Sequence, residues 1–215
     1  MPYDYAQELE SVTSDLVKMC ELVNHAITQA TTALLNDDLE IAQTVIDGDE
    51  AINTLNQQVD ETCMRITALQ APIAGDLRLV IGGIRMATSI ERMGDLASHI
   101  AKQVRLRYPS PSIPEDLKKT FSEMGDAASM ITAATARVIK NRDTDLADDI
   151  KRFDDQLDRL HRELFTVVLS DDWDKGVEAA IDVTLLSRFY ERFGDHAVTV
   201  ARRVIHIVTG DPYTK

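Results

Sequence analysis

The chain has 215 residues, a formal net charge of −13 and only two cysteines. At this length one domain or two small ones can bury a hydrophobic core, so a disulfide-stapled miniprotein is excluded. The acidic balance opposes the phosphate backbone of nucleic acids and the anionic face of membranes, which argues against a nucleic-acid-binding protein. With only 9 glycines and 6 prolines, the chain has too few turn formers for an all-β fold, and a mostly helical protein is expected.

Three long helices are predicted in the first half of the chain. Apolar residues at alternating steps of three and four predict a helix over about 6–35. Asn36-Asp37-Asp38 then offers a turn and an N-cap for a second helix that ends near residue 70. Pro72 marks a short break, after which a third helix runs to about Arg107. The second helix has an apolar stripe that consists of Val45, Ile52, Leu55, Val59, Cys63 and Ile66.

The second half repeats this order after a proline-rich stretch. Pro109, Pro111 and Pro114 interrupt any helix at the midpoint, because proline cannot continue a helix interior. Helices are predicted over about 114–141, from the polar segment 141–145 to about 169, and over about 175–209. The fifth helix carries a stripe of Phe153, Leu157, Leu160, Leu164 and Val167. We therefore expect an all-α fold of two antiparallel three-helix bundles, at 1–107 and 115–215, joined by a linker at 108–114.

The ends and the cysteines give no sign of export or metal-thiolate chemistry. The N-terminus has neither a basic segment nor an apolar one, and no 18 consecutive residues stay apolar, so a cytoplasmic protein is expected. Cys20 and Cys63 lie far apart without a CxxC pattern, which predicts two small core residues rather than a redox or zinc site.

A short acidic motif occurs once in each half. ERMGD at 91–95 and ERFGD at 191–195 lie 100 positions apart, at the same place in the last helix of each half, which indicates a duplication. Two acids at i and i+4 share one helix face and can reach one cation. The acids of both motifs are predicted to point away from the apolar stripe of their helix. In the third helix, however, the same outward face carries Leu77, Ile81 and Ile84 nearer its start, so part of this face should be covered. Glycine inside a helix costs about 1 kcal/mol relative to alanine, so the presence of Gly94 and Gly194 calls for an explanation. Either a neighbouring helix approaches closely there, or the glycine leaves room for a ligand.

The second helix of each half has a matching polar pair. Asp49 and Asn53 precede Leu55, and Asp154 and Asp158 precede Leu160, again at i and i+4. If the second and third helices of a bundle are neighbours, these pairs converge on the acidic motifs. Ligands made only of carboxylates suit hard cations, so Mg²⁺, Mn²⁺ or iron is expected rather than zinc or copper. The two predicted sites comprise Asp154, Asp158, Glu191 and Asp195 in one, and Asp49, Glu91 and Asp95 in the other.

The sequence offers little support for an enzyme. No Ser/His/Asp or Cys/His set stands at an interpretable spacing, and no glycine-rich phosphate loop is present. An all-α, Mg²⁺-dependent nucleotide pyrophosphatase is an alternative, but its motifs have ExxE and ExxD spacing, whereas the repeated spacing here is ExxxD. A ferritin-like di-metal bundle would need ExxH pairs, and no glutamate is followed by histidine at i+3.

Two further motifs accompany ERMGD and ERFGD: QAPIAGDLR at 70–78 and DEAIN at 49–53. With these motifs, and over nearly its whole length, the sequence resembles the PhoU family of phosphate-transport accessory proteins. This resemblance implies two similar three-helix bundles with metal ions, iron clusters in some members, held by acidic motifs on the bundle surface. Carried over by position, the ligands would be Asp49, Glu91, Asp95, Asp154, Asp158, Glu191 and Asp195.

The chain departs from the family pattern at three positions. Asn53 replaces the second acid of the first DxxxD pair, which weakens that site by one charge. His99 and Thr199 stand where asparagine is common in the family. His99 is either an additional nitrogen ligand or a hydrogen-bonded surface histidine, and His196, beside Asp195, is another candidate ligand.

The resemblance also implies a function. The family acts as a signalling adaptor between the high-affinity phosphate ABC transporter, through its ATPase subunit, and a sensor histidine kinase. It represses the phosphate-starvation response when phosphate is plentiful. An accessory protein of a low-affinity phosphate carrier is a close alternative. No nucleic acid is expected as a partner, any membrane association would be through partners, and a second copy of the chain is a candidate partner in a homodimer.

Overall fold

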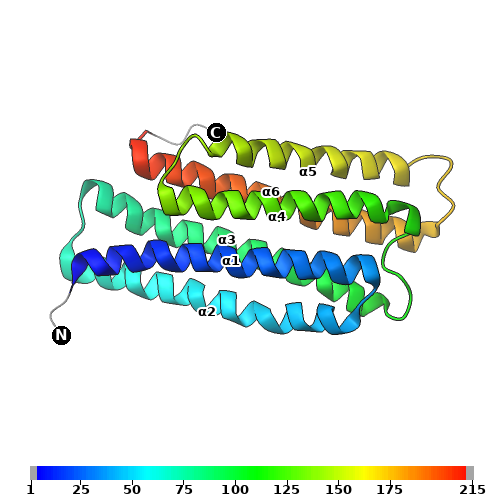
Figure 1. Cartoon of the computed structure of the whole chain (residues 1–215), viewed down its shortest axis with the longest axis horizontal. Helices are drawn as coiled ribbons and strands as arrows, with labels where there is room; N and C mark the ends of the chain where they lie inside the picture. Colours follow the sequence, from blue (N-terminus) through cyan, green and yellow to red (C-terminus); the bar gives the residue numbers. More distant parts are fainter. Residues whose placement is uncertain (1–3, 212–215) are drawn as a thin grey trace.

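The computed structural model describes residues 4–211, apart from the side chain of Ala147. Within this range it contains helices and no strands, as predicted, and the ends of the predicted bundles at 1–3 and 212–215 lie outside the described residues. No helix in the described part is long and apolar enough to cross a membrane. The elements are α1 (Tyr5–Asn36), α2 (Leu39–Gln70), α3 (Ala74–Arg107), a 3₁₀ turn η1 (Glu115–Leu117), α4 (Lys118–Asn141), α5 (Ala147–Val168) and α6 (Gly176–Thr209) (Figure 1).

The turn between α1 and α2 is built as the sequence predicts. Asp37 ends α1 in the left-handed region, with φ at 53°. Asp38 is the N-cap of α2, and its Oδ1 accepts a hydrogen bond of 2.9 Å from the amide of Ile41. Capping satisfies an amide that has no partner inside the helix. This turn makes α1 and α2 antiparallel neighbours.

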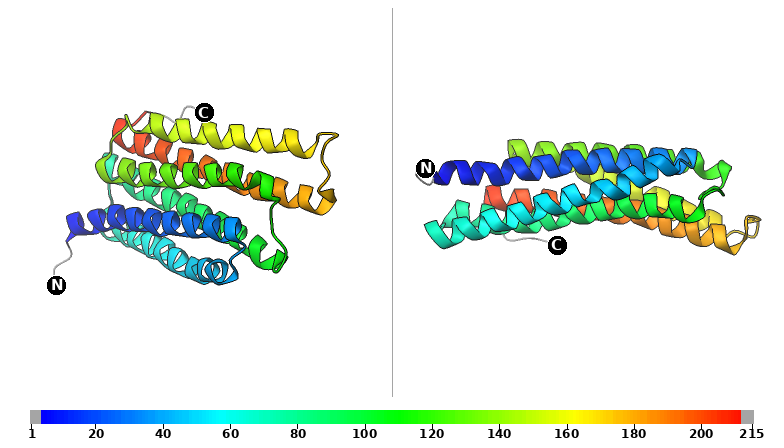
Figure 2. Two further views of the ribbon diagram at one scale, coloured as in Figure 1. Left: turned by 45° about the vertical axis from the view of Figure 1, so that its right-hand side comes forward. Right: turned by 90° about the horizontal axis from the view of Figure 1, so that it is seen from below.

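The six helices form two three-helix bundles that lie side by side along one long axis (Figures 1 and 2). Helices α1, α2 and α3 pack on one another, and so do α4, α5 and α6. The bundles meet where α1 packs on α4 and α3 packs on α6, whereas among the described residues α2 and α5 contact only their own bundle. The order of neighbours α2, α3, α6, α5 therefore brings the two acidic motifs to adjacent helices at the centre.

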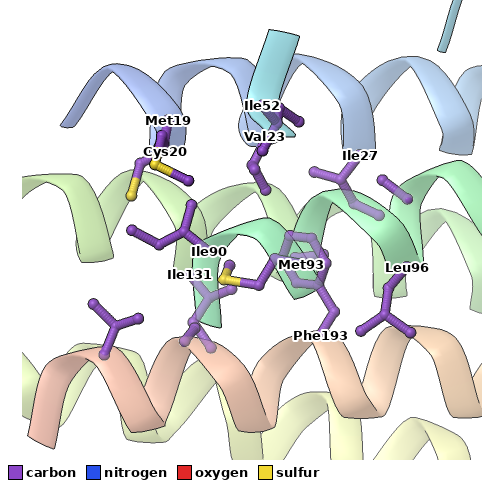
Figure 3. Packing of buried hydrophobic residues seen from close by; sticks show 14 of the residues in the cluster. Met19, Cys20, Val23, Ile27, Ile52, Ile90, Met93, Leu96, Ile131 and Phe193 are labelled. Carbon is purple, nitrogen blue, oxygen red and sulfur yellow. The ribbon is translucent and has the colours of Figure 1, made fainter. Parts of the chain in front are cut away.

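One hydrophobic core runs through both bundles. Figure 3 shows Ile27 of α1, Met93 of α3, Ile131 of α4 and Phe193 of α6 in this core, all fully buried. The predicted stripe of α2 is buried. The expectation for Val167 is wrong: it is 40 % exposed, and the next residue, Val168, packs against the core instead, four residues after the buried Leu164.

The cysteines are core residues, as the sequence predicts. Cys20 and Cys63 are buried and carry free thiols. Burial raises the pKa of each thiol to about 12. Neither side chain is therefore a reactive thiolate at neutral pH.

Polar contacts also join the two bundles. The hydroxyl of Tyr190 on α6 lies 2.7 Å from Oγ1 of Thr31 on α1. At one end of the α3–α6 contact, Gln103 Nε2 donates a 2.6 Å hydrogen bond to Oδ1 of the buried Asp182. The proline-rich stretch packs as well, since Ile113 is buried. The bundles thus share an interface, and the boundaries of two separate domains stay a prediction.

Candidate metal centres

The first acidic cluster consists of Asp49 and Asn53 on α2 with Glu91 and Asp95 on α3. Gly94 lets α2 approach closely, because a Cβ at this position would lie 2.8 Å from Cδ1 of Ile52 and 3.6 Å from Oδ1 of Asp49. Asn53 Nδ2 donates a 3.4 Å hydrogen bond to Oδ2 of Asp49. The glycine is explained by helix packing, and the packing sets Asp49 against the acidic motif of α3.

The carboxylates of this cluster are close enough to repel one another. Burial is the main cause that raises the pKa of Asp49 and of Glu91, and the charge of Asp95 raises both further. Arg92 offsets part of the repulsion, since its Nη1 donates a 2.8 Å hydrogen bond to Oδ2 of Asp95 and its Nε lies 3.5 Å from Oε2 of Glu91. The cluster is a partly neutralised set of three carboxylates and one amide.

The second acidic cluster consists of Asp154, Asp155 and Asp158 on α5 with Glu191 and Asp195 on α6. One carboxylate oxygen from each of the three aspartates of α5 lies within 4.8 Å of the others. A Cβ at Gly194 would lie 2.8 Å from Oδ1 of Asp154 and 3.0 Å from Cδ1 of Leu157. Here too the close approach of a neighbouring helix explains the glycine, and one of the atoms that approach it belongs to a carboxylate.

Two buried oxygens of the second cluster have no hydrogen-bond donor among the described residues. They are Oδ1 of Asp154 and Oε2 of Glu191. The other oxygens of these carboxylates do have cationic partners: Nζ of Lys151 lies 3.3 Å from Oδ2 of Asp154, and Arg188 pairs with Oε1 of Glu191. Buried carboxylate oxygens almost always have a partner, so an oxygen-seeking cation fits this cluster.

The electrostatics of the second cluster agree with this fit. Burial is the main cause that raises the pKa of Asp154 and of Glu191, although Lys151 and Arg188 oppose it, and the charges of Asp158 and Asp195 raise both further. The structure therefore brings together all four residues that the sequence placed here. A divalent cation would add to the positive charge that Lys151 and Arg188 already bring to these carboxylates.

The comparisons with known proteins identify the family. A PhoU domain model matches twice, at residues 16–104 and 121–204. The chain is 47% identical over 206 residues to "Phosphate-specific transport system accessory protein PhoU homolog 2" of Mycobacterium tuberculosis. The match covers 96% of this chain and 97% of that protein. The chain belongs to the PhoU family.

Other members of the PhoU family match over nearly their full length. PhoU homolog 1 of Mycobacterium leprae is 45% identical and PhoU homolog of Aquifex aeolicus is 35% identical; the matches cover 96% and 95% of this chain and 93% of each relative. The crystal structure of PhoU from Streptococcus pneumoniae superposes with a TM-score of 0.87 at 25% identity, covering 99% of this chain and 100% of that one. PhoU from Pseudomonas aeruginosa gives 0.82 at 29% identity, covering 97% and 100%. The predicted fold and family are confirmed.

Each PhoU domain match contains one acidic cluster, but the two clusters differ in charge. The first has three carboxylates, because Asn53 stands where the second has Asp158. The second also has Asp155, which the sequence analysis missed. Two consecutive acids placed three and four residues before Asp158 were the available signal. With five carboxylates against three, the second cluster is the more acidic of the two in this PhoU protein.

The two histidines proposed as ligands lie at the edge of the clusters. His99 is exposed, and its ring stacks on Phe189 of α6 with centroids 5.4 Å apart. Burial lowers the pKa of His196, the charges of Arg192 and of Arg92 in the first bundle lower it further, and Asp195 opposes them. Arg92 of this PhoU protein thus acts on His196 across the contact of α3 with α6. Coordination by either histidine stays a prediction.

Proposed function

We propose that this protein is a cytoplasmic, metal-binding regulator of phosphate uptake. In this proposal it contacts the ATPase subunit of the phosphate ABC transporter and a sensor histidine kinase, and it represses the phosphate-starvation response when phosphate is plentiful. The observation that carries the proposal is the match over nearly the full length to proteins named phosphate-specific transport system accessory proteins. Those names favour this system over a low-affinity phosphate carrier.

The metal part of the proposal is supported by the second acidic cluster. One buried carboxylate oxygen of Asp154 and one of Glu191 have no hydrogen-bond donor among the described residues. All the ligand atoms of this cluster are carboxylate oxygens. Hard cations, Mg²⁺, Mn²⁺ or iron, bind such sets. A bound cation would supply positive charge between α5 and α6, and would tie the two helices together through Asp154, Asp158, Glu191 and Asp195.

An adaptor role suits what the site offers chemically. The relatives are named accessory or regulatory proteins. The clusters lie on helices, beside exposed surface, where a cation would stabilise a docking face rather than process a substrate. A pyrophosphatase assay with Mg²⁺ and common nucleotides checks this point, since turnover by the purified protein would contradict a purely regulatory role.

Elemental analysis tests the metal proposal. Protein purified without chelator is compared with the double variant Glu191→Gln/Asp195→Asn, which removes two charges and keeps the side-chain shapes. Asp171→Asn/Asp172→Asn, in the exposed connection between α5 and α6, is the matched control for net charge. Metal bound to the wild type and the control but lost from the double variant is expected. Equal metal content in all three would overturn the metal proposal.

A reporter assay tests the regulatory proposal. The gene is deleted in its own host, and a promoter of the phosphate-starvation response is monitored in phosphate-rich medium. We expect the reporter to turn on and to be silenced again by the wild-type gene. An unchanged reporter would contradict the proposed repression, whatever the metal content.

A further inference from the structure

A small basic cavity lies between the start of α3 and the end of α6, away from both acidic clusters. Its volume is about 160 Å³. The residues that line it come from these two helices, which run side by side here (Figure 1). They are Leu77, Arg78, Ile81, Gly82, Arg85, Arg203 and His206.

Close packing of the two helices forms the floor of this cavity. The two helices come close together at Gly82, because a Cβ there would lie 2.7 Å from Cδ1 of Ile207. Without a side chain at position 82, the long side chains of α3 and α6 can converge above the contact. The cavity is therefore a consequence of the helix crossing rather than of a mobile loop.

Arg78 is held in place at one edge of the cavity. Its Nε donates a 3.3 Å hydrogen bond to the carbonyl of Ile207 in the last turn of α6. Its Cζ lies 3.5 Å from the position that a Cβ on Gly210 would take, so the guanidinium packs on the end of that helix. Because Nε is engaged, the two terminal nitrogens are the donors left to face a ligand.

Two of the arginines in this cavity, Arg78 and Arg85, have no acidic partner among the described residues. In the range 4–211, neither Arg78 nor Arg85 forms a salt bridge, and no acidic residue lines the cavity. The nearest acid in sequence, Asp76, faces α1 instead, where the hydroxyl of Tyr5 donates a 2.8 Å hydrogen bond to it. Three guanidiniums beside one small cavity are unusual in a chain with a net charge of −13.

We propose that this cavity binds a phosphoryl-type oxyanion, either free inorganic phosphate or the terminal phosphate of a larger molecule. Arginine presents paired N–H donors that match the oxygens of phosphate. Sites for drug-sized ligands occupy about 300–1,000 Å³, so a volume of about 160 Å³ admits one tetrahedral anion but not a whole nucleotide. This inference does not rest on the proposed regulatory function or on metal binding.

Equilibrium dialysis with radiolabelled phosphate tests the proposal. The full chain is first freed of metal with a chelator and dialysed, so that no phosphate binds through a cation. Labelled inorganic phosphate and labelled ATP are titrated in separate arms, with sulfate as a competing tetrahedral anion. Binding of phosphate identifies the free anion as ligand, and binding of ATP alone identifies a terminal phosphate group.

The variants are chosen to separate a specific site from general charge. Arg85→Gln removes an exposed guanidinium of the cavity without touching the packing at Arg78. Arg202→Gln, at an exposed position of α6 outside the cavity, removes the same charge. We expect one saturable site in the wild type, weakened about tenfold or more by Arg85→Gln and unchanged within about twofold by Arg202→Gln. Thermal unfolding checks that both variants fold.

Three outcomes would overturn the proposal. The first is no saturable binding of phosphate or ATP to the wild type. The second is equal affinity of the wild type and Arg85→Gln. The third is an equal loss in Arg85→Gln and Arg202→Gln, which would show that only net charge matters.

Discussion

Gly194 on α6 lies directly against Asp154 on α5, and a Cβ at position 194 would stand 2.8 Å from Oδ1 of Asp154. Gly194→Ala is therefore expected to push this carboxylate out of the second acidic cluster. Alanine favours a helix by about 1 kcal/mol over glycine, but overpacking costs about 1–3 kcal/mol. We expect a net loss of about 1 kcal/mol in the free energy of unfolding, measured with urea, and a reduced metal content.

Gly48→Ala is the matched control for this prediction. Gly48 lies inside α2, and a Cβ there would meet no atom within 4 Å. The same substitution should therefore stabilise the protein by about 0.5–1 kcal/mol through helix propensity alone. If Gly194→Ala stabilised the protein as much as Gly48→Ala, the close contact with Asp154 would be refuted.

Charge repulsion in the second cluster should lower the stability of the metal-free protein. Glu191 has a raised pKa, mainly from burial, and its Oε2 has no donor among the described residues. In chelator, Glu191→Gln should raise the free energy of unfolding by about 1 kcal/mol, because it removes a buried charge near Asp195 and Asp158. Its loss of the pair with Arg188, which is half exposed, should matter little.

The same variant should lose most of the stabilisation by metal. A ligand at about 100 times its dissociation constant stabilises the native state by about 2.7 kcal/mol. Added Mn²⁺ should therefore stabilise the wild type and leave Glu191→Gln nearly unchanged, when both are unfolded by urea with and without chelator. A variant that is less stable than the wild type in chelator would show that Glu191 is already satisfied without a cation.

The fold was predictable because its determinants are local. Long apolar stripes of helical period, few glycines and prolines, and the Asp37-Asp38 turn each act within one or two helices. The members of the acidic clusters were predictable for the same reason, since i and i+4 spacing on two neighbouring helices fixes which carboxylates face one another. The duplicated ERMGD and ERFGD motifs then placed two clusters at equivalent positions.

What the sequence did not predict depends on contacts between distant segments. Thr31 and Tyr190 are 159 positions apart, and no pattern in the sequence predicts the hydrogen bond between them. The basic cavity likewise joins Arg78 and Arg85 with Arg203, three arginines that look like ordinary surface charges until α3 and α6 are placed side by side. Asp155 was missed because an acid beside another acid usually belongs to a solvated face.

The hydrogen bond between Thr31 and Tyr190 allows an asymmetric prediction. Oγ1 of Thr31 donates to the carbonyl of Ile27, so its lone pair accepts the proton of the buried Tyr190 hydroxyl. Tyr190→Phe should cost about 1 kcal/mol in the free energy of unfolding, because Thr31 keeps its other partner. Thr31→Val should cost about 1–3 kcal/mol, since it leaves the hydroxyl of Tyr190 buried with no acceptor.

A double-mutant cycle checks this asymmetry. In Thr31→Val/Tyr190→Phe the buried hydroxyl without an acceptor is gone, so the double variant should be no less stable than Thr31→Val alone. Urea unfolding of the four proteins gives the coupling free energy. Simple addition of the two single effects would mean that the side chains do not interact.

His161 should make the metal-free protein less stable in mild acid. Its Nδ1 lies 2.8 Å from Oγ of Ser187, and burial lowers its pKa below the usual value near 6.5, as does the charge of Arg188, while Asp158 opposes them. A histidine with a lowered pKa in the folded state takes up its proton more readily after unfolding. Its contribution to stability is therefore full above about pH 6.5 and is lost as the pH falls through the folded pKa.

His161→Asn should remove this part of the pH dependence, because asparagine can still hydrogen bond to Ser187 but does not titrate. Urea midpoints measured in chelator between pH 8 and 5 should converge for the two proteins as the pH falls, because only the wild type loses the contribution of His161. The carboxylates of the second cluster titrate in both proteins, so the difference between the curves isolates the imidazole. His25→Asn, at an exposed position of α1, is the control, and parallel curves for His161→Asn and the wild type would contradict the prediction.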